Sequence, residues 1–173
     1  MKMIQKSTLL FFIGILVAPC ISIAQNEFAK SAISVGVVVE NLDKSLEFYK
    51  DVVGMQEVRE FSVDSEKATK MGLSDGERFD VKVLKLENTE QAAEWKLMSF
   101  NNRTSHKTKK YIPDENGIRY ITIFVKSMSP LLERIKKHNV KTLGETPVML
   151  DETRQFVLIQ DPDGNFVEFI GPK

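Results

Sequence analysis

The sequence is poor in cysteine, in net charge and in catalytic motifs. Its 173 residues contain one cysteine, and 24 Lys and Arg residues balance 24 Asp and Glu residues. A single cysteine excludes an intramolecular disulfide framework and a cysteine-based zinc site. A formal charge of zero provides no global positive field to attract nucleic acid or anionic lipid. We therefore expect a small molecule or a protein as partner, and no nucleic acid.

Several chemical patterns are also missing. The chain has no glycine-rich phosphate loop, no nucleophile elbow and no Ser-His-Asp context, so covalent acyl or phosphoryl chemistry is not expected. Its two histidines, His106 and His138, fall on a polar connector and at a predicted helix end, which argues against a shared metal site. A hydrophobic content of 42% suits one globular domain, or two small modules that share a core.

The one long apolar run lies at the N-terminus. Lys2 and Lys6 precede an apolar stretch that is too short for a comfortable membrane span, and Ser22 and Ala24 supply small residues for a cleavage site. We predict a signal peptide over residues 1–24, and hence a secreted or periplasmic protein with no membrane contact after cleavage. Two alternatives stay open: lipoprotein processing at Cys20, which the preceding proline disfavours, and a retained anchor.

The remainder of the chain contains an internal repeat at a spacing of 86 residues. Residues 34–39 then align with residues 120–125, and in both copies aliphatic side chains alternate as in a half-buried strand. Each strand is followed by an amphipathic helix pattern. Asp43 and Ser129 are the predicted N-caps, and Gly54 is predicted to end the first helix.

Further strands are predicted after each helix. The Asp161-Pro162-Asp163-Gly164 sequence predicts a hairpin turn between the last two, because Pro presets the turn and Gly accepts the positive φ that follows. Two βαβββ modules result, over residues 31–100 and 117–171, joined by a connector at 101–116. The first module alone carries a polar insertion at 62–78. The predicted strands cover residues 55–61, 79–86, 94–100, 140–144, 155–160 and 165–170.

Two stretches, residues 37–55 and 161–169, together resemble the vicinal oxygen chelate (VOC) superfamily of glyoxalase I, bleomycin-resistance proteins and extradiol dioxygenases. The similarity covers nearly all of residues 31–171. It implies an α+β fold in which two tandem βαβββ modules form a cup of curved mixed sheets. It also implies a divalent metal at the floor of the cup, with ligands from the first and last strand of each module.

The four ligand positions that the resemblance implies fall on Ser34, Lys96, Tyr120 and Glu168. Only Glu168 is of the metal-ligand type, because a lysine cation repels a divalent ion and a serine is a weak neutral donor. We therefore expect no metal and no other cofactor. Instead, Lys96 is expected to act as the counter-charge to Glu168, either to orient a ligand or as a purely structural ion pair. The predicted apolar wall of the ligand site consists of Met98, Tyr120, Phe124 and Phe166.

The leading functional hypothesis is a secreted or periplasmic, metal-independent VOC protein that binds a small organic molecule in its cup. The alternative is a metal-dependent enzyme, either a lyase or isomerase like glyoxalase I or a dioxygenase, which would use Glu168 and further donors. A protein-interaction module and a metal-free acid–base role for Lys96 or Glu168 also stay open. The resemblance allows glutathione adducts, aromatic diols and antibiotics as ligands, and leaves a homodimer open.

Overall fold

The computed structural model describes residues 28–100 and 109–173, and the chain divides into two compact units, 1–31 and 32–173. The described part of the first unit, residues 28–31, contains no helix or strand. The predicted signal peptide, Cys20 and the part of the connector with His106 lie outside the described residues. Within the described ranges, no helix combines the length and the apolar character needed to cross a membrane.

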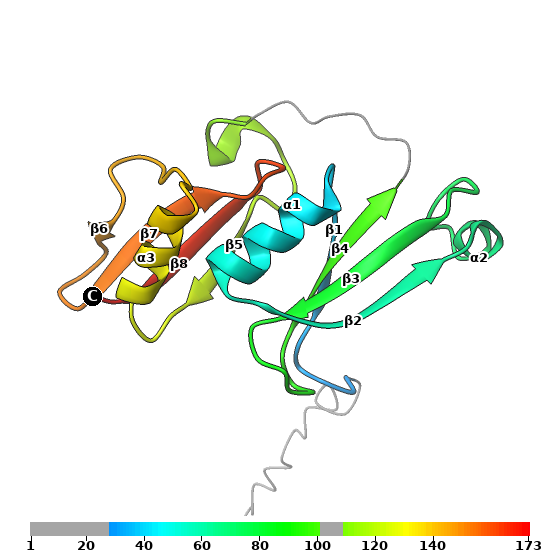
Figure 1. The fold of residues 1–173 in the computed structure, drawn as a ribbon, viewed down its shortest axis with the longest axis horizontal. Coiled ribbons are helices and arrows are strands. Elements are labelled where there is room, and N and C mark those ends of the chain that lie inside the picture. The colour runs from blue at the N-terminus through cyan, green and yellow to red at the C-terminus, as the bar shows by residue number, and fades with distance from the viewer. Residues whose placement is uncertain (1–27, 101–108) are drawn as a thin grey trace, which may run out of the picture. The chain divides into compact units, whose positions relative to one another are not determined.

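The first module forms a four-stranded sheet of order β1-β4-β3-β2 (Figure 1). The parallel pairing of β1 with β4 sets the two ends of the module side by side, while the other neighbours run antiparallel. Its elements in chain order are β1 (Ser34–Val38), α1 (Leu42–Glu47), the π-helical segment η2 (Phe48–Val53), β2 (Gln56–Val63), α2 (Ser65–Lys70), β3 (Phe79–Lys85) and β4 (Glu94–Phe100).

The second module repeats this arrangement in the order β5-β8-β7-β6. Its β5 pairs in parallel with β8, as β1 does with β4. The predicted α+β class and the βαβββ repeat are therefore confirmed. The elements are the connector's short helix η3 (Ile112–Asp114), β5 (Tyr120–Phe124), α3 (Ser129–Lys137), β6 (Val148–Met149), β7 (Arg154–Gln160) and β8 (Phe166–Pro172).

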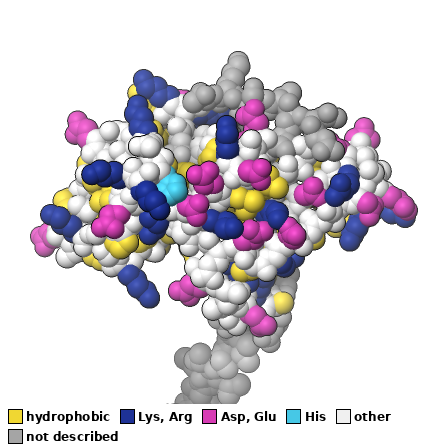
Figure 2. Space-filling view, viewed as in Figure 1, with side chains coloured by type: hydrophobic (Ala, Val, Ile, Leu, Met, Phe, Trp, Pro, Cys, Tyr) yellow, Lys and Arg dark blue, Asp and Glu magenta, His cyan; other side chains and the backbone are white. Residues whose placement is uncertain are grey.

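One hydrophobic core joins the two modules. It contains residues from α1–η2 and α3 together with inward-facing residues of both sheets, so both helices pack on the same side (Figure 1). Trp95, which the alternation along β4 places opposite Lys96, is 8% exposed and belongs to this core, as expected. Because the helices bury one face of each sheet, the opposite face, called the open face below, is left for other contacts. Figure 2 shows acidic and basic side chains interspersed over one side of the molecule.

The helix starts differ from the prediction by one or two residues. Asn41, not Asp43, caps α1: its backbone is extended and its side chain accepts a hydrogen bond from the Lys44 N–H at 3.0 Å. Asp43 already lies in the first turn. Ser129 is the first residue of α3 and not its cap; the N-cap position is Met128, whose side chain makes no capping hydrogen bond. The predicted end at Gly54 is confirmed, with φ of 93°.

One prediction about the strands needs correction, and the polar insertion gains a helix that the sequence analysis did not assign. The predicted strand at 140–144 is wrong: Thr142 makes only an isolated bridge to Ile159, and the edge strand β6 lies later, at Val148–Met149. Gly144, with φ of 61°, turns the chain between the two segments, which prevents one continuous strand. The polar insertion contains a helix, α2, which Asp64 caps by accepting from the Lys67 N–H at 2.8 Å.

Candidate functional site

The strand register shows that Lys96 and Glu168 are equivalent positions of the two modules. Gly36 lies beside Lys96 in the β1–β4 pair, and Thr122, 86 residues after Gly36, lies beside Glu168 in the β5–β8 pair. In the first module, Trp95 belongs to the shared core, so its neighbour Lys96 faces the open side of the sheet. By the same alternation Glu168 lies on the open face of the second sheet.

The expected ion pair between Lys96 and Glu168 is not found, and each residue has a partner within its own sheet. The Lys96 ammonium lies 3.5 Å from Glu94, and the Glu168 carboxylate accepts a hydrogen bond from the Thr122 hydroxyl. Glu94 is two residues before Lys96 on the same strand, so alternation brings both side chains to the same face. Glu94 therefore balances the positive charge of Lys96 within the first sheet, and no contact with the second sheet is needed.

Four side chains on the open face of the first sheet form what we call the charged cluster: Ser34, Arg59, Glu94 and Lys96. The Ser34 hydroxyl donates to Glu94 at 3.0 Å, and Arg59 Nη2 lies 3.2 Å from both Glu94 carboxylate oxygens. Partial burial acts to raise the pKa of Glu94, but the hydrogen bonds from Ser34 and Arg59 and the nearby Lys96 charge outweigh it and lower the pKa to about 2. Glu94 is therefore ionised at any ordinary pH.

The residues at the implied metal positions do not fit a divalent ion. Lys96 is a cation, Ser34 uses its hydroxyl to donate to Glu94, and Tyr120 is a neutral phenol 47% exposed. In the described part of the chain, no group of three or more His, Cys, Asp or Glu residues is placed to hold a metal. Three of the four implied metal positions therefore carry a cation or a weak neutral donor, whereas a divalent metal requires several carboxylate or imidazole ligands.

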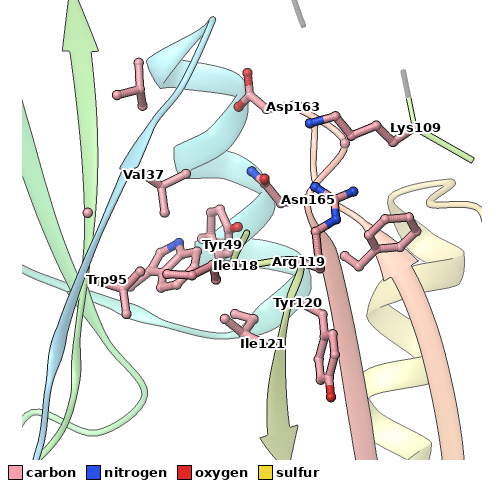
Figure 3. Close-up of a pocket in the computed structure, with 15 residues that line it drawn as sticks. Val37, Tyr49, Trp95, Lys109, Ile118, Arg119, Tyr120, Ile121, Asp163 and Asn165 are labelled. Atoms are coloured by element: carbon pink, nitrogen blue, oxygen red, sulfur yellow. The ribbon is translucent and has the colours of Figure 1, made fainter. Parts of the chain in front are cut away.

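A pocket of about 260 Å³, called the seam pocket below, lies where the edge strands β1 and β5 of the two sheets approach each other. Figure 3 shows Trp95 on one side of the pocket and Arg119 and Tyr120 on the other, with Tyr49 and Ile118 between them. The remaining lining residues come from β1, from β5, from the β7–β8 turn with the start of β8, and from the connector: Val35, Gly36, Val37, Val38, Ile121, Asp163, Gly164, Asn165, Phe166 and Lys109.

A buried hydrogen bond between the modules borders the seam pocket. The Tyr49 hydroxyl donates to Asp161 at 2.7 Å, and the same carboxylate accepts from the Asn165 backbone and side chain. Burial, with the Asp161 charge adding to it, raises the pKa of Tyr49 well above its ordinary value. Burial also raises the pKa of Asp161, against its hydrogen bonds from Asn165 and Tyr49. These hydrogen bonds hold the β7–β8 turn in place.

One end of the seam pocket is polar and is formed by Asp163 of the β7–β8 turn together with Arg119 and Lys109. Asp163 accepts from the Glu40 N–H at 2.7 Å and from the Ser45 hydroxyl at 3.1 Å, which fixes the β7–β8 turn on α1. Arg119 donates from Nε to the Ile112 carbonyl at 2.9 Å and pairs with Glu115, which also pairs with Lys109. The turn that the sequence predicted only as a hairpin therefore also closes one end of a pocket.

The predicted site residues are divided between two places. Tyr120 and Phe166 line the seam pocket, although Phe166 is only 1% exposed and packs 5.8 Å beneath the Arg119 guanidinium. Phe124 is 71% exposed on the open face of the second sheet, and Met98 packs on the first sheet. Ser34, Lys96 and Glu168 lie on the open faces and not among the residues that line the pocket.

Sequence reasoning missed several residues of these sites. Glu94 shares the face of Lys96 and was detectable from alternation alone, whereas Arg59 reaches the charged cluster across β3 after a register shift between Glu57 and Arg59. Lys109 comes from the connector and Arg119 lies directly before β5, and neither position is part of a strand pattern in the sequence. No sequence signal places those two residues at the seam pocket.

Comparisons with known proteins agree with this architecture. A model of the Glyoxalase/Bleomycin resistance protein/Dioxygenase superfamily matches residues 31–169. A lactoylglutathione lyase of Neisseria meningitidis serogroup A is 27% identical over 135 residues, which cover 78% of this chain and 86% of that protein.

Two solved structures share the fold. A glyoxalase family protein of Bacillus cereus has a TM-score of 0.69 at 17% identity and covers 87% of this chain and 99% of its own. The trypanothione-dependent glyoxalase I of Leishmania major has a TM-score of 0.53 at 23% identity, covering 80% of this chain and 84% of its own.

Proposed function

Because the chain belongs to the glyoxalase, bleomycin resistance protein and dioxygenase superfamily, we propose that it is a secreted or periplasmic protein that binds a small organic molecule without a divalent metal. The observation that carries this proposal is the chemistry at the implied metal positions. Lys96 takes the place of an acidic ligand, and its positive charge is paired with Glu94 at 3.5 Å. Metal binding there would require a lysine to lose its proton and Ser34 to lose its hydrogen bond to Glu94.

Exposed apolar side chains support a ligand beside the seam pocket. Val38, Phe61, Tyr120 and Phe124 are each between 39% and 71% exposed, and alternation places all four on the open faces of the two sheets. Exposed apolar surface of this kind is typical of ligand grooves and other binding surfaces. The seam pocket of about 260 Å³ lies next to this surface, because Val38 and Tyr120 also line it.

Metal analysis of the mature protein tests the proposal. We expect well under one zinc, nickel, manganese or iron per chain, and the same melting temperature with EDTA as with added metal. Near-stoichiometric metal that raises the melting temperature and is lost in Glu168→Gln would contradict it. Glu66→Gln is the matched control, because Glu66 lies on the exposed face of α2 and pairs only locally with Lys70.

The similarity to lactoylglutathione lyase favours one second candidate, a metal-dependent lyase. In that case the protein would form or break down lactoylglutathione in the presence of nickel or zinc, and Glu168→Gln would abolish this activity. If lyase activity is absent with every metal tested, the binding function is favoured.

Mass spectrometry of the secreted or periplasmic fraction tests the location. We expect a chain that begins at Gln25 and lacks lipid. A lipid-modified N-terminal Cys20, or an intact Met1 in the membrane fraction, would replace this proposal with an anchored protein.

A further inference from the structure

The charged cluster contains two cations and one carboxylate, so it carries an excess positive charge. Glu94 is enclosed, with 11% of its side chain exposed, whereas 29% of Lys96 and 49% of Arg59 remain exposed. Lys96 lies 3.5 Å from the carboxylate, which is longer than a good charge-assisted hydrogen bond. An incoming anion can therefore reach both cations, while the internal carboxylate stays covered.

Arg59 keeps donors for such an anion. It contacts Glu94 through Nη2, and among the described residues no further hydrogen bond is found for its other two nitrogens. Its guanidinium carbon lies 5.3 Å from the centre of the Phe61 ring. This stacking limits the orientations of the fork, which favours a planar oxyanion over a spherical ion.

The surroundings of the cluster are apolar. Val83 lies beside Lys96 on β3, and Met98 follows two residues later on the same face. Gly36 lies beside Lys96 on β1, and a side chain there would meet Met98 Cε at 3.0 Å. The Met98 side chain therefore covers Gly36, which also lines the seam pocket, so a ligand that extends from the charged cluster towards the pocket would lie over Met98.

We propose that the charged cluster binds the carboxylate of an organic acid, and that the apolar body of this acid extends over Met98 towards the seam pocket. The proposal rests on the proposed function and specifies its ligand class. Lys96 and Arg59 neutralise the carboxylate, and Glu94 is an internal competitor that already occupies one side of both cations. Without Glu94 the two cations would attract an external anion more strongly, because one negative charge is removed while Ser34 and the fold remain.

Pairs of ligands that differ only in charge provide the test. Benzoate and phenylacetate are compared with benzamide and phenylacetamide, using the mature full chain, titration calorimetry and melting temperature. We expect each carboxylate to bind at least about tenfold more tightly than its amide, a difference that a charge-assisted contact can supply. Binding should also weaken as NaCl rises, because the cations are exposed and therefore screened.

Four variants locate the effect. Lys96→Met should lower carboxylate affinity at least about fivefold, whereas Lys96→Arg should largely retain it and Glu94→Gln should raise it about fivefold. Lys126→Met removes an exposed positive charge from the loop before α3 and should leave affinity unchanged. Melting curves without ligand verify that each variant is folded.

The possible outcomes separate the two proposals. If amides bind as well as carboxylates, or if Lys96→Met binds as the native chain does, the carboxylate proposal is overturned while small-molecule binding stands. Failure of every member of the panel to bind also overturns it. A stoichiometric metal held by Glu168 would instead overturn the proposed function itself.

Discussion

The two modules have the same backbone register but different chemistry on their open faces. Lys96, with Glu94 and Arg59, occupies in the first module the position that Glu168, with Thr122, occupies in the second. On the core side the equivalent residues remain apolar, as in Trp95 and Val167. The core face is constrained by packing against the helices, whereas the open face can change its charge without loss of the fold.

The first module also has an addition that the second lacks in the described residues. Its insertion folds as α2, and Ala68 from this helix packs with residues of β2 and β3 in a second hydrophobic cluster. The cluster consists of Val63, Ala68, Phe79, Val81 and Val83, with Val58, Met98 and Phe100 at its edge. One end of the first open face is therefore covered by the chain itself, while the end with the charged cluster is accessible.

The largest predicted effect on stability is at a position where a Cβ atom does not fit in the second module but is already present in the first. Gly171→Ala would place a Cβ 2.4 Å from the Val125 carbonyl oxygen, a backbone atom that cannot move easily. We expect a loss of about 2–3 kcal/mol in the free energy of unfolding, measured by urea denaturation. The equivalent residue of the first module is Ser99, which already has a Cβ, so Ser99→Ala should cost less than about 1 kcal/mol. Equal losses for both variants would show that the modules do not differ here.

A smaller effect concerns the hydrogen bond that joins the modules. Tyr49 is equivalent to Ile135 of the second module, and both are buried, but only Tyr49 carries a hydroxyl, which donates to Asp161. Tyr49→Phe should cost about 1–2 kcal/mol, because Asp161 loses one of its donors in a buried setting. Tyr120→Phe is the control and should change stability by less than about 0.5 kcal/mol, since Tyr120 is half-exposed. If Tyr49→Phe leaves the free energy of unfolding unchanged, the hydrogen bond to Asp161 does not stabilise the fold.

The smallest predicted effect is the contribution of Glu94, in the charged cluster of the first module, to the pH dependence of stability. The pKa of folded Glu94 is about 2, below its ordinary value of 4.5, so its stabilisation is complete above about pH 4.5 and is lost as the pH falls towards 2. We expect this contribution to be less than about 1 kcal/mol, because the cations are solvent-accessible. Glu94→Gln should remove it, so the native chain and the variant should converge in stability at low pH. Glu66→Gln, on exposed α2, should leave the pH profile unchanged.

Much of the fold could be predicted because local sequence patterns indicate its strands, helices and turns. The repeat, the alternation along β1 and β5 and the turn at residues 161–164 led to the correct modules, and Trp95 was correctly assigned to the core. The prediction was wrong where the local sequence allows more than one conformation and tertiary contacts decide between them. Residues 140–144 are apolar enough for a strand, but the turn at Gly144 and the pairing of β7 shift the edge strand to Val148–Met149.

The site was predicted less well than the fold. The positions of Lys96 and Glu168 on the open faces follow from alternation, but their partners do not, because a long side chain can reach several neighbours. Lys96 pairs with Glu94 along its own strand, and Arg59 joins them from β2. The contact of Arg59 depends on the register shift in β2 between Glu57 and Arg59, which no local sequence pattern specifies.

The sequence alone determined which face of each strand is buried, since the period of two along a strand is fixed by backbone geometry. It also determined that the implied metal positions hold a lysine, a serine and a tyrosine beside one glutamate. Only the tertiary structure decided which charges meet and that β1, β5 and the β7–β8 turn enclose a pocket. These contacts join residues that are far apart in the chain, so their distances depend on how the sheets and helices pack and not on any local pattern.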